Sequence, residues 1–229
     1  MGSISSIRES DPTVLADRLR QDLLDYLQPD DLVCIPTGRS PEFLYSLVGN
    51  DPASTRLWQQ LRYLQLDEYI SPPEATENFR STLHRQVFGP LKISPKQIFS
   101  IESEQDPEKE VCRLNTLFDE IGPPHAVILG LGTNGHIAFN EPCDTPRSGY
   151  QIVDLNPMTI RDNFPEPIPP SLQAITIGLD QLKAAKRVYL LVPQAEKSQI
   201  LDRCLSGPND PRVPGSILHD HPDLHVYRH

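Results

Sequence analysis

This 229-residue chain has few cysteines, no cluster of basic residues and no long apolar segment. Its four cysteines are widely separated and form no Cys-x-x-Cys pair, so we predict neither a disulfide framework nor a zinc site, and reduced thiols in a cytoplasmic protein fit best. Lys and Arg are scattered singly against a net charge of -10, which argues against a nucleic-acid partner. No apolar run approaches the length of a membrane span, and the first residues lack the apolar core of a signal peptide, so we expect no membrane partner.

Short apolar runs alternate with amphipathic helical patterns along most of the chain. Runs of strand length occupy residues 32–35, 61–66, 97–101, 126–129, 174–177 and 188–192. Helical patterns occupy residues 11–26, 41–48, 79–87, 107–121 and 195–205. Several strands are apolar at consecutive positions, as expected of strands covered on both faces. The alternation predicts an α/β fold with a mostly parallel sheet, and the 38% apolar content suffices for one domain over residues 1–229.

Residues 142–170 are the least regular part of the chain. They include seven prolines and few periodic apolar positions. Long irregular segments inside a domain are often active-site lids. We expect a lid here, and the alternative is a surface loop without such a role.

A glycine-rich turn follows the buried strand at 126–129. The turn Gly130–Gly135 fits the Gly-x-Gly-x-x-Gly pattern of dinucleotide sites, and Asp154 lies about twenty residues further on. That pattern requires a helix of several turns to begin inside the glycines, whereas Pro142 and Pro146 follow within a few residues. We therefore do not favour a nicotinamide cofactor.

The first histidine after this turn, His136, is a candidate for proton transfer because imidazole titrates near neutral pH. Glu141 could contact the ring only if the intervening loop curls back, and it would then raise the basicity of the ring and orient it. A structural histidine is the alternative. Four other histidines near the end of the chain have irregular spacing, and we interpret them as surface residues without a metal role: His219, His221, His225 and His229.

Two further turns carry polar side chains. Thr37 and Ser40 lie in a glycine turn that leads into a helix, where free backbone amides and two hydroxyls would bind an anion; the alternative is an ordinary turn with Ser40 as helix cap. Asp67 and Glu68 are adjacent carboxylates at the end of an apolar strand, so they should point to opposite sides, one toward a crevice and the other into the loop. A solvated pair is the alternative for these acids.

These segments together resemble the glucosamine-6-phosphate deaminases. The resemblance rests on three strings in the same order and extends over nearly the whole chain: Ile-Pro-Thr-Gly-x-Ser-Pro at 35–41, Leu-Asp-Glu-Tyr at 66–69, and Gly-x-Gly-x-x-Gly-His-Ile-Ala-Phe-Asn-Glu-Pro at 130–142. It implies a single-domain, Rossmann-like three-layer sandwich. It also implies a cofactor-free conversion of glucosamine 6-phosphate to fructose 6-phosphate and ammonia, with a phosphosugar as the small-molecule partner.

The resemblance also implies roles for particular residues. His136, oriented by Glu141, would move protons during opening of the sugar ring, and Asp67 would carry a proton from C2 to C1. The residues expected to bind the substrate and its phosphate are Thr37, Gly38, Arg39, Ser40, Gly132, Arg161 and Lys197.

Two positions depart from the family pattern. Asn134 stands where the family usually has an aspartate beside the histidine, so it can hydrogen-bond but brings no charge, which should lower the pKa of His136. Arg39 stands where a glycine is more usual, and it would either add a phosphate contact or crowd one. These departures leave the exact amino-sugar phosphate open.

Two other functions remain as alternatives. A 6-phosphogluconolactonase would share the fold and phosphate turn, although its members typically have Gly-His-Thr-Ala-Ser and Asp-Glu-Arg in place of the strings at 135–139 and 67–69. A sugar-phosphate-binding module without catalysis is the other, and Asn134 gives it some support. The sequence leaves allosteric regulation and the oligomeric state open.

Overall fold

The computed structural model describes residues 3–73 and 76–229. Its centre is a seven-stranded sheet in which every neighbouring pair is parallel, in the order β1-β10-β9-β6-β2-β3-β5. Its strands are β1 (Ser3–Arg8), β2 (Leu32–Cys34), β3 (Arg62–Leu64), β5 (Ile98–Phe99), β6 (Ala126–Leu129), β9 (Arg187–Val192) and β10 (Asp223–Arg228). The predicted parallel α/β sheet is therefore confirmed.

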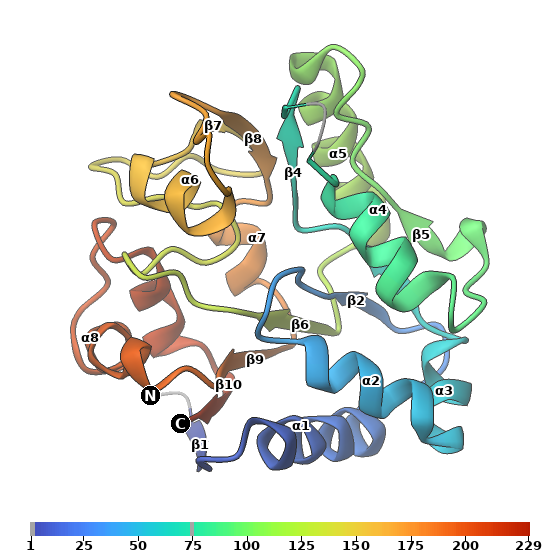
Figure 1. The fold of residues 1–229 in the computed structure, drawn as a ribbon. Coiled ribbons are helices and arrows are strands. Elements are labelled where there is room, and N and C mark those ends of the chain that lie inside the picture. Colours follow the sequence, from blue (N-terminus) through green and yellow to red (C-terminus); the bar gives the residue numbers. More distant parts are fainter. Residues whose placement is uncertain (1–2, 74–75) are drawn as a thin grey trace.

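Helices cover both faces of this sheet. One face packs against α1 (Pro12–Tyr26), α2 (Glu42–Asn50), α3 (Pro52–Trp58) and α4 (Phe79–Leu83), which continues into a π-helical turn at His84–Phe88 (Figure 1). The other face packs against α5 (Pro107–Ile121), α7 (Leu179–Lys183) and α8 (Ser198–Ser206). Apolar residues on both faces of the strands are thereby buried, which explains the unbroken apolar runs.

Local capping explains where two long helices begin. Asp11 accepts a hydrogen bond from Thr13 N at the start of α1, and Asp106 accepts from Glu108 N at the start of α5. Proline occupies the first turn of both helices, where its missing N–H costs nothing. In the described part of the chain, no helix is long and apolar enough to cross a bilayer.

A second, antiparallel sheet corrects part of the sequence prediction. It has the order β4-β8-β7 and consists of β4 (Asp67–Ile70), β8 (Gln173–Thr176) and β7 (Gln151–Asp154). The run at 174–177 thus belongs to this sheet and not to the parallel one. Strands β1, β4, β7 and β10 were not predicted, because they are short, mixed in polarity or at an edge and lack a continuous apolar run.

The segment 142–170 is more regular than its prolines suggest. It contains β7 and the helix α6 (Pro157–Asn163), which begins at an Asn156 cap whose side chain accepts from Met158 N. Its apolar side chains join an aromatic cluster with the second sheet and with the loop that follows the turn 130–135; the cluster includes Tyr69, Phe139, Leu155, Ile160, Phe164, Leu172 and Ala174. This cluster holds α6 against the second sheet, beside β7 and β8 in Figure 1.

Candidate active site

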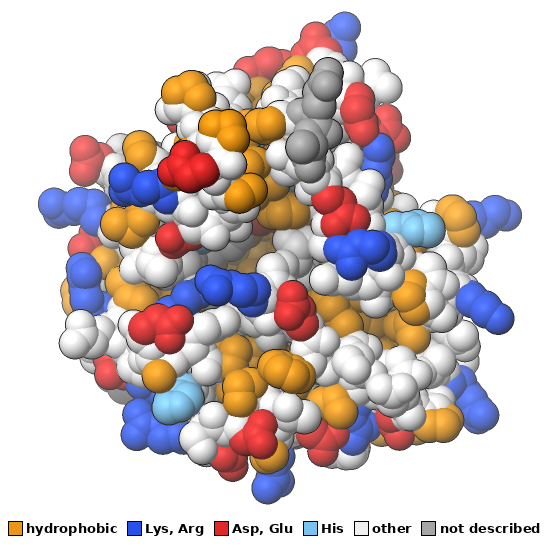
Figure 2. All heavy atoms as spheres, in the orientation of Figure 1, with side chains coloured by type: hydrophobic (Ala, Val, Ile, Leu, Met, Phe, Trp, Pro, Cys, Tyr) orange, Lys and Arg blue, Asp and Glu red, His pale blue; other side chains and the backbone are white. Residues whose placement is uncertain are grey.

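A cleft of about 460 Å³ lies at the carboxyl ends of β2, β6 and β9. Figure 2 shows this face hollowed, with basic and acidic side chains along the rim. Crevices at the carboxyl ends of parallel strands are the usual ligand sites of open α/β sheets. The lining comes from six stretches and one single residue: 36–40, 66–67, 129–133, 136–139 without Ile137, 162–163, 194–197 without Ala195, and Phe79.

The turn after β2 forms one wall of the cleft. Thr37, Gly38, Arg39 and Ser40 all line it, and Gly38 has a φ of +87°, a left-handed conformation that glycine adopts without strain. Ser40 does not cap helix α2, since α2 begins after Pro41 and has no side-chain cap. Instead, the Ser40 hydroxyl accepts a hydrogen bond from Gln194 Nε2 at 3.0 Å.

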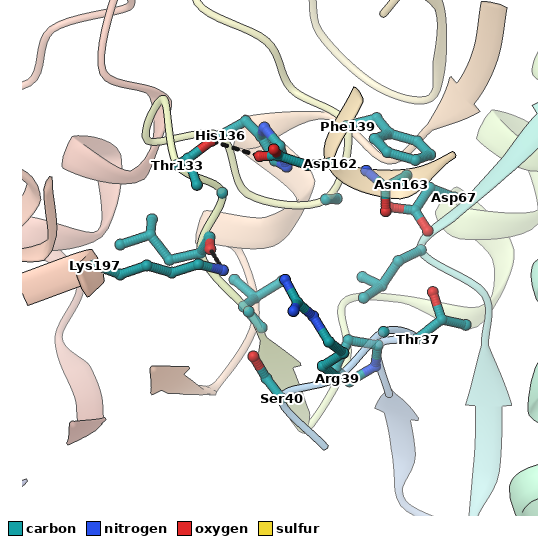
Figure 3. A pocket seen from close by; sticks show the side chains of 18 of the residues that line it. Thr37, Arg39, Ser40, Asp67, Thr133, His136, Phe139, Asp162, Asn163 and Lys197 are labelled. Carbon is teal, nitrogen blue, oxygen red and sulfur yellow. Dashed lines mark hydrogen bonds between the residues drawn. The ribbon is translucent and has the colours of Figure 1, made fainter. Parts of the chain in front are cut away.

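Two cations project into the cleft from opposite walls. Figure 3 shows Lys197, just before α8, and Arg39, after β2, pointing into the same space. Lys197 Nζ donates to Leu131 O at 2.6 Å. Burial lowers the pKa of Lys197, and the positive charge of Arg39 lowers it further, so the two cations are close enough to interact. This end of the cleft suits an anion.

Asp67 and Glu68 point in opposite directions, as strand alternation predicts. Asp67 lines the cleft, and its pKa is raised to about 8 by burial and then by the charge of Glu68. Glu68 is 1% exposed and accepts hydrogen bonds from the backbone N–H groups of Tyr69, Phe79 and Arg80. It therefore ties β4 to the start of α4 and holds this side of the cleft in place.

His136 and Glu141 approach each other because the loop between them turns back. Ala138 has a φ of +49°, and Asn140 N donates to Ile137 O at 3.1 Å. His136 Nδ1 comes within 3.8 Å of Glu141 Oε2, which is too long for a hydrogen bond. The acid and the imidazole thus meet, as the sequence suggested, but without direct bonding.

Asn134 lies between the two groups and bonds to both. Its Nδ2 donates to Glu141 Oε2 at 2.7 Å, and its Oδ1 lies 2.8 Å from His136 Nδ1. Since the amide nitrogen is used for the carboxylate, Oδ1 is the acceptor, and Nδ1 must carry the hydrogen. The other ring nitrogen, Nε2, is then unprotonated when the ring is neutral and can accept a proton.

The pKa of His136 is lowered, the direction that the sequence suggested, but the main cause is burial rather than the uncharged Asn134. Glu141 opposes this shift because its negative charge favours the imidazolium. Gly132 explains how the ring fits: a Cβ at this position would lie 2.3 Å from His136 Cε1. Only glycine allows the ring to lie against the turn.

Helix α6 contributes Asp162 and Asn163 to the cleft, whereas Arg161 is exposed and does not line it. The Asp162 carboxylate accepts a hydrogen bond from Thr133 Oγ1 at 2.8 Å, which links α6 to the glycine turn. The structure therefore brings together the expected residues of the 37–40 turn, Asp67, Gly132, His136 and Lys197, but it leaves Arg161 outside.

Several lining residues were not identified from the sequence. Gln194 follows the carboxyl end of β9, just as the turns 37–40 and 130–135 follow the carboxyl ends of β2 and β6. A polar side chain directly after a buried strand is therefore the sequence signal that could have identified it. Phe79 and Phe139 form an apolar wall with ring centroids 5.6 Å apart. Asp162 had no comparable signal, because only the folding of α6 brings it to the cleft.

The late histidines correct one expectation. His221 is fully buried, accepts a hydrogen bond from Asp223 N and lies 2.9 Å from Ala185 O, so it is a structural residue rather than a surface one. Within residues 3–73 and 76–229, no three His, Cys, Asp or Glu side chains form a group suited to a metal. All four cysteines are free.

The cleft thus combines two cations at one end, a carboxyl with a raised pKa and an imidazole with a defined tautomer. The carboxyl, with a pKa of about 8, and the imidazole, whose Nε2 can accept a proton, both face the same space (Figure 3). Such a pair can move protons between neighbouring atoms of one ligand whose anionic group is held at the other end.

Comparisons with known proteins agree on one family. The family model described as glucosamine-6-phosphate isomerases/6-phosphogluconolactonase matches residues 13–226. A glucosamine-6-phosphate deaminase of Lachnoclostridium phytofermentans is 31% identical over 212 residues, which cover 87% of each chain. The structure of a monomeric glucosamine-6-phosphate deaminase is 26% identical, with a TM-score of 0.89 over 98% of this chain and 96% of the other. A 6-phosphogluconolactonase from Leishmania guyanensis, 13% identical, shares the fold with a TM-score of 0.76, covering 99% of this chain and 96% of that one.

Proposed function

This chain belongs to the family of glucosamine-6-phosphate isomerases and 6-phosphogluconolactonases, and we propose that it is a glucosamine-6-phosphate deaminase. The reaction converts glucosamine 6-phosphate and water to fructose 6-phosphate and ammonia. The observation that carries the proposal is the arrangement of Asp67 and His136 around one cleft whose other end holds two cations. The deaminase relatives, at 31% and 26% identity, support the same substrate.

The phosphate would bind at the cationic end. The turn 37–40 lines the cleft and would supply backbone amides and hydroxyls, and Lys197 and Arg39 supply positive charge. Gln194 would keep the Ser40 hydroxyl in place through its hydrogen bond. Arg161 would reach the phosphate only after a movement of α6, and we propose that residues 142–170 form a lid that makes this movement.

Ring opening would use His136. Its Nε2 accepts the proton of the anomeric hydroxyl and returns a proton to the ring oxygen as the C1–O5 bond breaks. Asn134 fixes the ring so that Nε2 can act, and Glu141, through Asn134, supplies negative charge nearby.

Asp67 would carry out the isomerisation. In its ionised form it takes the proton from C2 of the open chain and returns it to C1. At the same time O1 gains a proton and the C2 amine loses one, so C1 becomes a CH₂OH carbon and C2 an imine. Water adds to C2, and ammonia departs. The ammonium group of the substrate would favour ionised Asp67, because a nearby positive charge lowers the pKa of a carboxyl.

The decisive experiment supplies the purified protein with glucosamine 6-phosphate, without added metal or nucleotide, and measures ammonia and fructose 6-phosphate. We expect both in equal amounts. Hydrolysis of 6-phosphogluconolactone without either product would identify a lactonase instead. Phosphosugar binding without turnover would identify a binding module.

A variant tests the role of Asp67 within this function. Asp67→Asn should abolish isomerisation and also the exchange of the C2 hydrogen with heavy water, while phosphosugar binding remains. The control is Asp25→Asn, on the exposed surface of α1. Asn163→Asp is not suitable as a control, because Asn163 also lines the cleft. Retained turnover in Asp67→Asn would remove this residue as the base.

The thiols suggest where the enzyme acts. Cys112 and Cys143 are exposed and unpaired with any other cysteine, which suits a reducing compartment. We propose a cytoplasmic location, and fractionation of the source cells would test it.

A further inference from the structure

Asn134 precedes Gly135, and this is the only Asn-Gly pair in the sequence. An asparagine followed by glycine can react with the next backbone nitrogen, because glycine has no side chain to block the approach. The ring product, a succinimide, then adds water and opens to aspartate or isoaspartate. In the folded protein, polar groups contact the side-chain carbonyl, the leaving amine and the attacking nitrogen of this reaction.

The side-chain carbonyl of Asn134 is the electrophile, and two N–H groups polarise it. Oδ1 accepts from His136 N at 3.1 Å and, as argued above, from His136 Nδ1 at 2.8 Å. Two donors on one carbonyl oxygen favour the negative charge that develops there when a nucleophile adds, as in an oxyanion hole. The bond to His136 N also makes an Asx turn, which curls the side chain over the Gly135 peptide.

The leaving amine and the attacking nitrogen also have defined partners. Asn134 Nδ2 donates to Glu141 Oε2 at 2.7 Å, so a carboxylate lies beside the departing nitrogen and can pass to it the proton that the Gly135 amide gives up. Gly135 N donates to Gly132 O at 3.0 Å, so it becomes available for attack when the turn 132–135 opens. The reaction rate should therefore follow the opening of this turn.

We propose that Asn134 is a self-modification site that converts to aspartate in the folded protein. The Gly135 nitrogen forms a bond to Asn134 Cγ, the Cγ–Nδ2 bond breaks, and ammonia leaves with the proton from the Gly135 amide. Water then adds to the succinimide carbonyl, and the ring opens to give a carboxylate at position 134. Water is the only co-reactant.

The conversion adds a negative charge between His136 and Glu141. The new carboxylate beside the ring favours the imidazolium, so the pKa of His136 rises, and two neighbouring carboxylates raise the pKa of one of them. Any effect on turnover rests on the proposed deaminase function. The modification itself does not, because mass measures it without an activity assay.

The test follows the mass of the peptide that contains Asn134 while folded protein is incubated at neutral and mildly alkaline pH in ¹⁸O-labelled water. We expect this peptide to gain one heavy-oxygen carboxylate, with the exposed Asn50, which precedes Asp51, unchanged as the control within the same chain. His136→Ala should lower the conversion rate by roughly tenfold, because it removes one of the two donors to Oδ1. This loss is smaller than the one that removal of an oxyanion-hole donor causes in enzymes.

A second variant covers the case in which His136→Ala fails to fold. Glu141→Gln keeps the size of the side chain and removes the carboxyl group beside the leaving amine, so conversion should slow. An unmodified Asn134 throughout the time in which denatured protein converts fully would overturn the proposal. So would equal rates in the wild type and both folded variants, because the Asn-Gly pair alone would then account for the reaction.

Discussion

Asp67 and Glu68 are adjacent, but their different surroundings give them different tasks. The Glu68 carboxylate accepts hydrogen bonds from backbone amides at the junction of β4 and α4, whereas the inward-facing Asp67 lines the cleft. Burial and the charge of Glu68 raise the pKa of Asp67 to about 8. Its protonation should therefore govern activity near neutral pH.

We predict that kcat/KM rises with pH through about 8, because Asp67 must be ionised to accept a proton and its pKa in the free protein is about 8. Between pH 7 and 9 the increase should be roughly tenfold. Initial rates across this range, corrected for the titration of the substrate amine, measure it. Glu68→Gln should move the rise to lower pH, whereas Glu120→Gln on the exposed surface of α5 should not. A flat profile would contradict the assignment.

A second prediction concerns Gly132. Gly132→Ala would place a Cβ 2.3 Å from His136 Cε1, so the ring must shift, and a displacement of about 1 Å can lower kcat by roughly a hundredfold. Gly49→Ala is the matched control, since nothing lies within 4 Å of its Cβ position in α2, and it should leave kcat unchanged. Equal kcat values for the two variants would show that the ring position is not critical.

At the scale of elements, α6 and the second sheet form one side of the cleft. The aromatic cluster holds them: Tyr69 packs against Phe139 and Phe164 with ring centroids 5.4 Å and 5.2 Å apart. Outside this cluster, α6 is tied to the glycine turn by the hydrogen bond between Thr133 and Asp162. Movement of α6 as a lid would have to loosen these contacts.

Phe164→Ala should therefore loosen the segment 151–172 more than the rest of the protein. The substitution removes a buried ring and should cost about 3 kcal/mol, with faster hydrogen exchange in this segment and a higher KM. Phe43→Ala is the control because Phe43 is 47% exposed. Exchange that increases uniformly over the chain would mean that α6 does not move as a separate unit.

At the scale of the whole molecule, the parallel sheet has a core on each face. In β9, Leu190 packs in the core shared with α5, α7 and α8, and Leu191 packs in the core shared with α1 and α2. The carboxyl ends of the same strands carry the cleft. The two cores thus fix the positions of the turns that line it.

Leu190→Ala and Leu191→Ala should each lower the free energy of unfolding by about 2–5 kcal/mol, because both side chains are buried, on opposite faces. Ile4→Ala, on the edge strand β1 and 39% exposed, should change it by less than about 1 kcal/mol. Urea unfolding of the three variants measures these values. A large loss for only one of the leucines would show that the sheet is stabilised mainly from one side.

The sequence by itself determined most strands of the parallel sheet, the long helices and the family. Apolar runs, helix caps and the strings at 35–41, 66–69 and 130–142 are local, so they predicted the parallel sheet, the long helices and the turns that line the cleft. The family assignment that these strings suggested is confirmed. Hydrophobic periodicity in the sequence indicates only which side of a helix or strand is buried.

Tertiary structure decided the contacts between distant segments. Three features depend on residues that are far apart in the chain: the antiparallel pairing of β4, β7 and β8, the hydrogen bond from Gln194 to Ser40, and the position of Asp162, rather than Arg161, in the lining of the cleft. The same is true of Asn134 on a smaller scale: its place between His136 and Glu141 depends on how the loop 137–140 turns back. Local patterns carry no information on such pairings, because they arise only when packing brings the elements together.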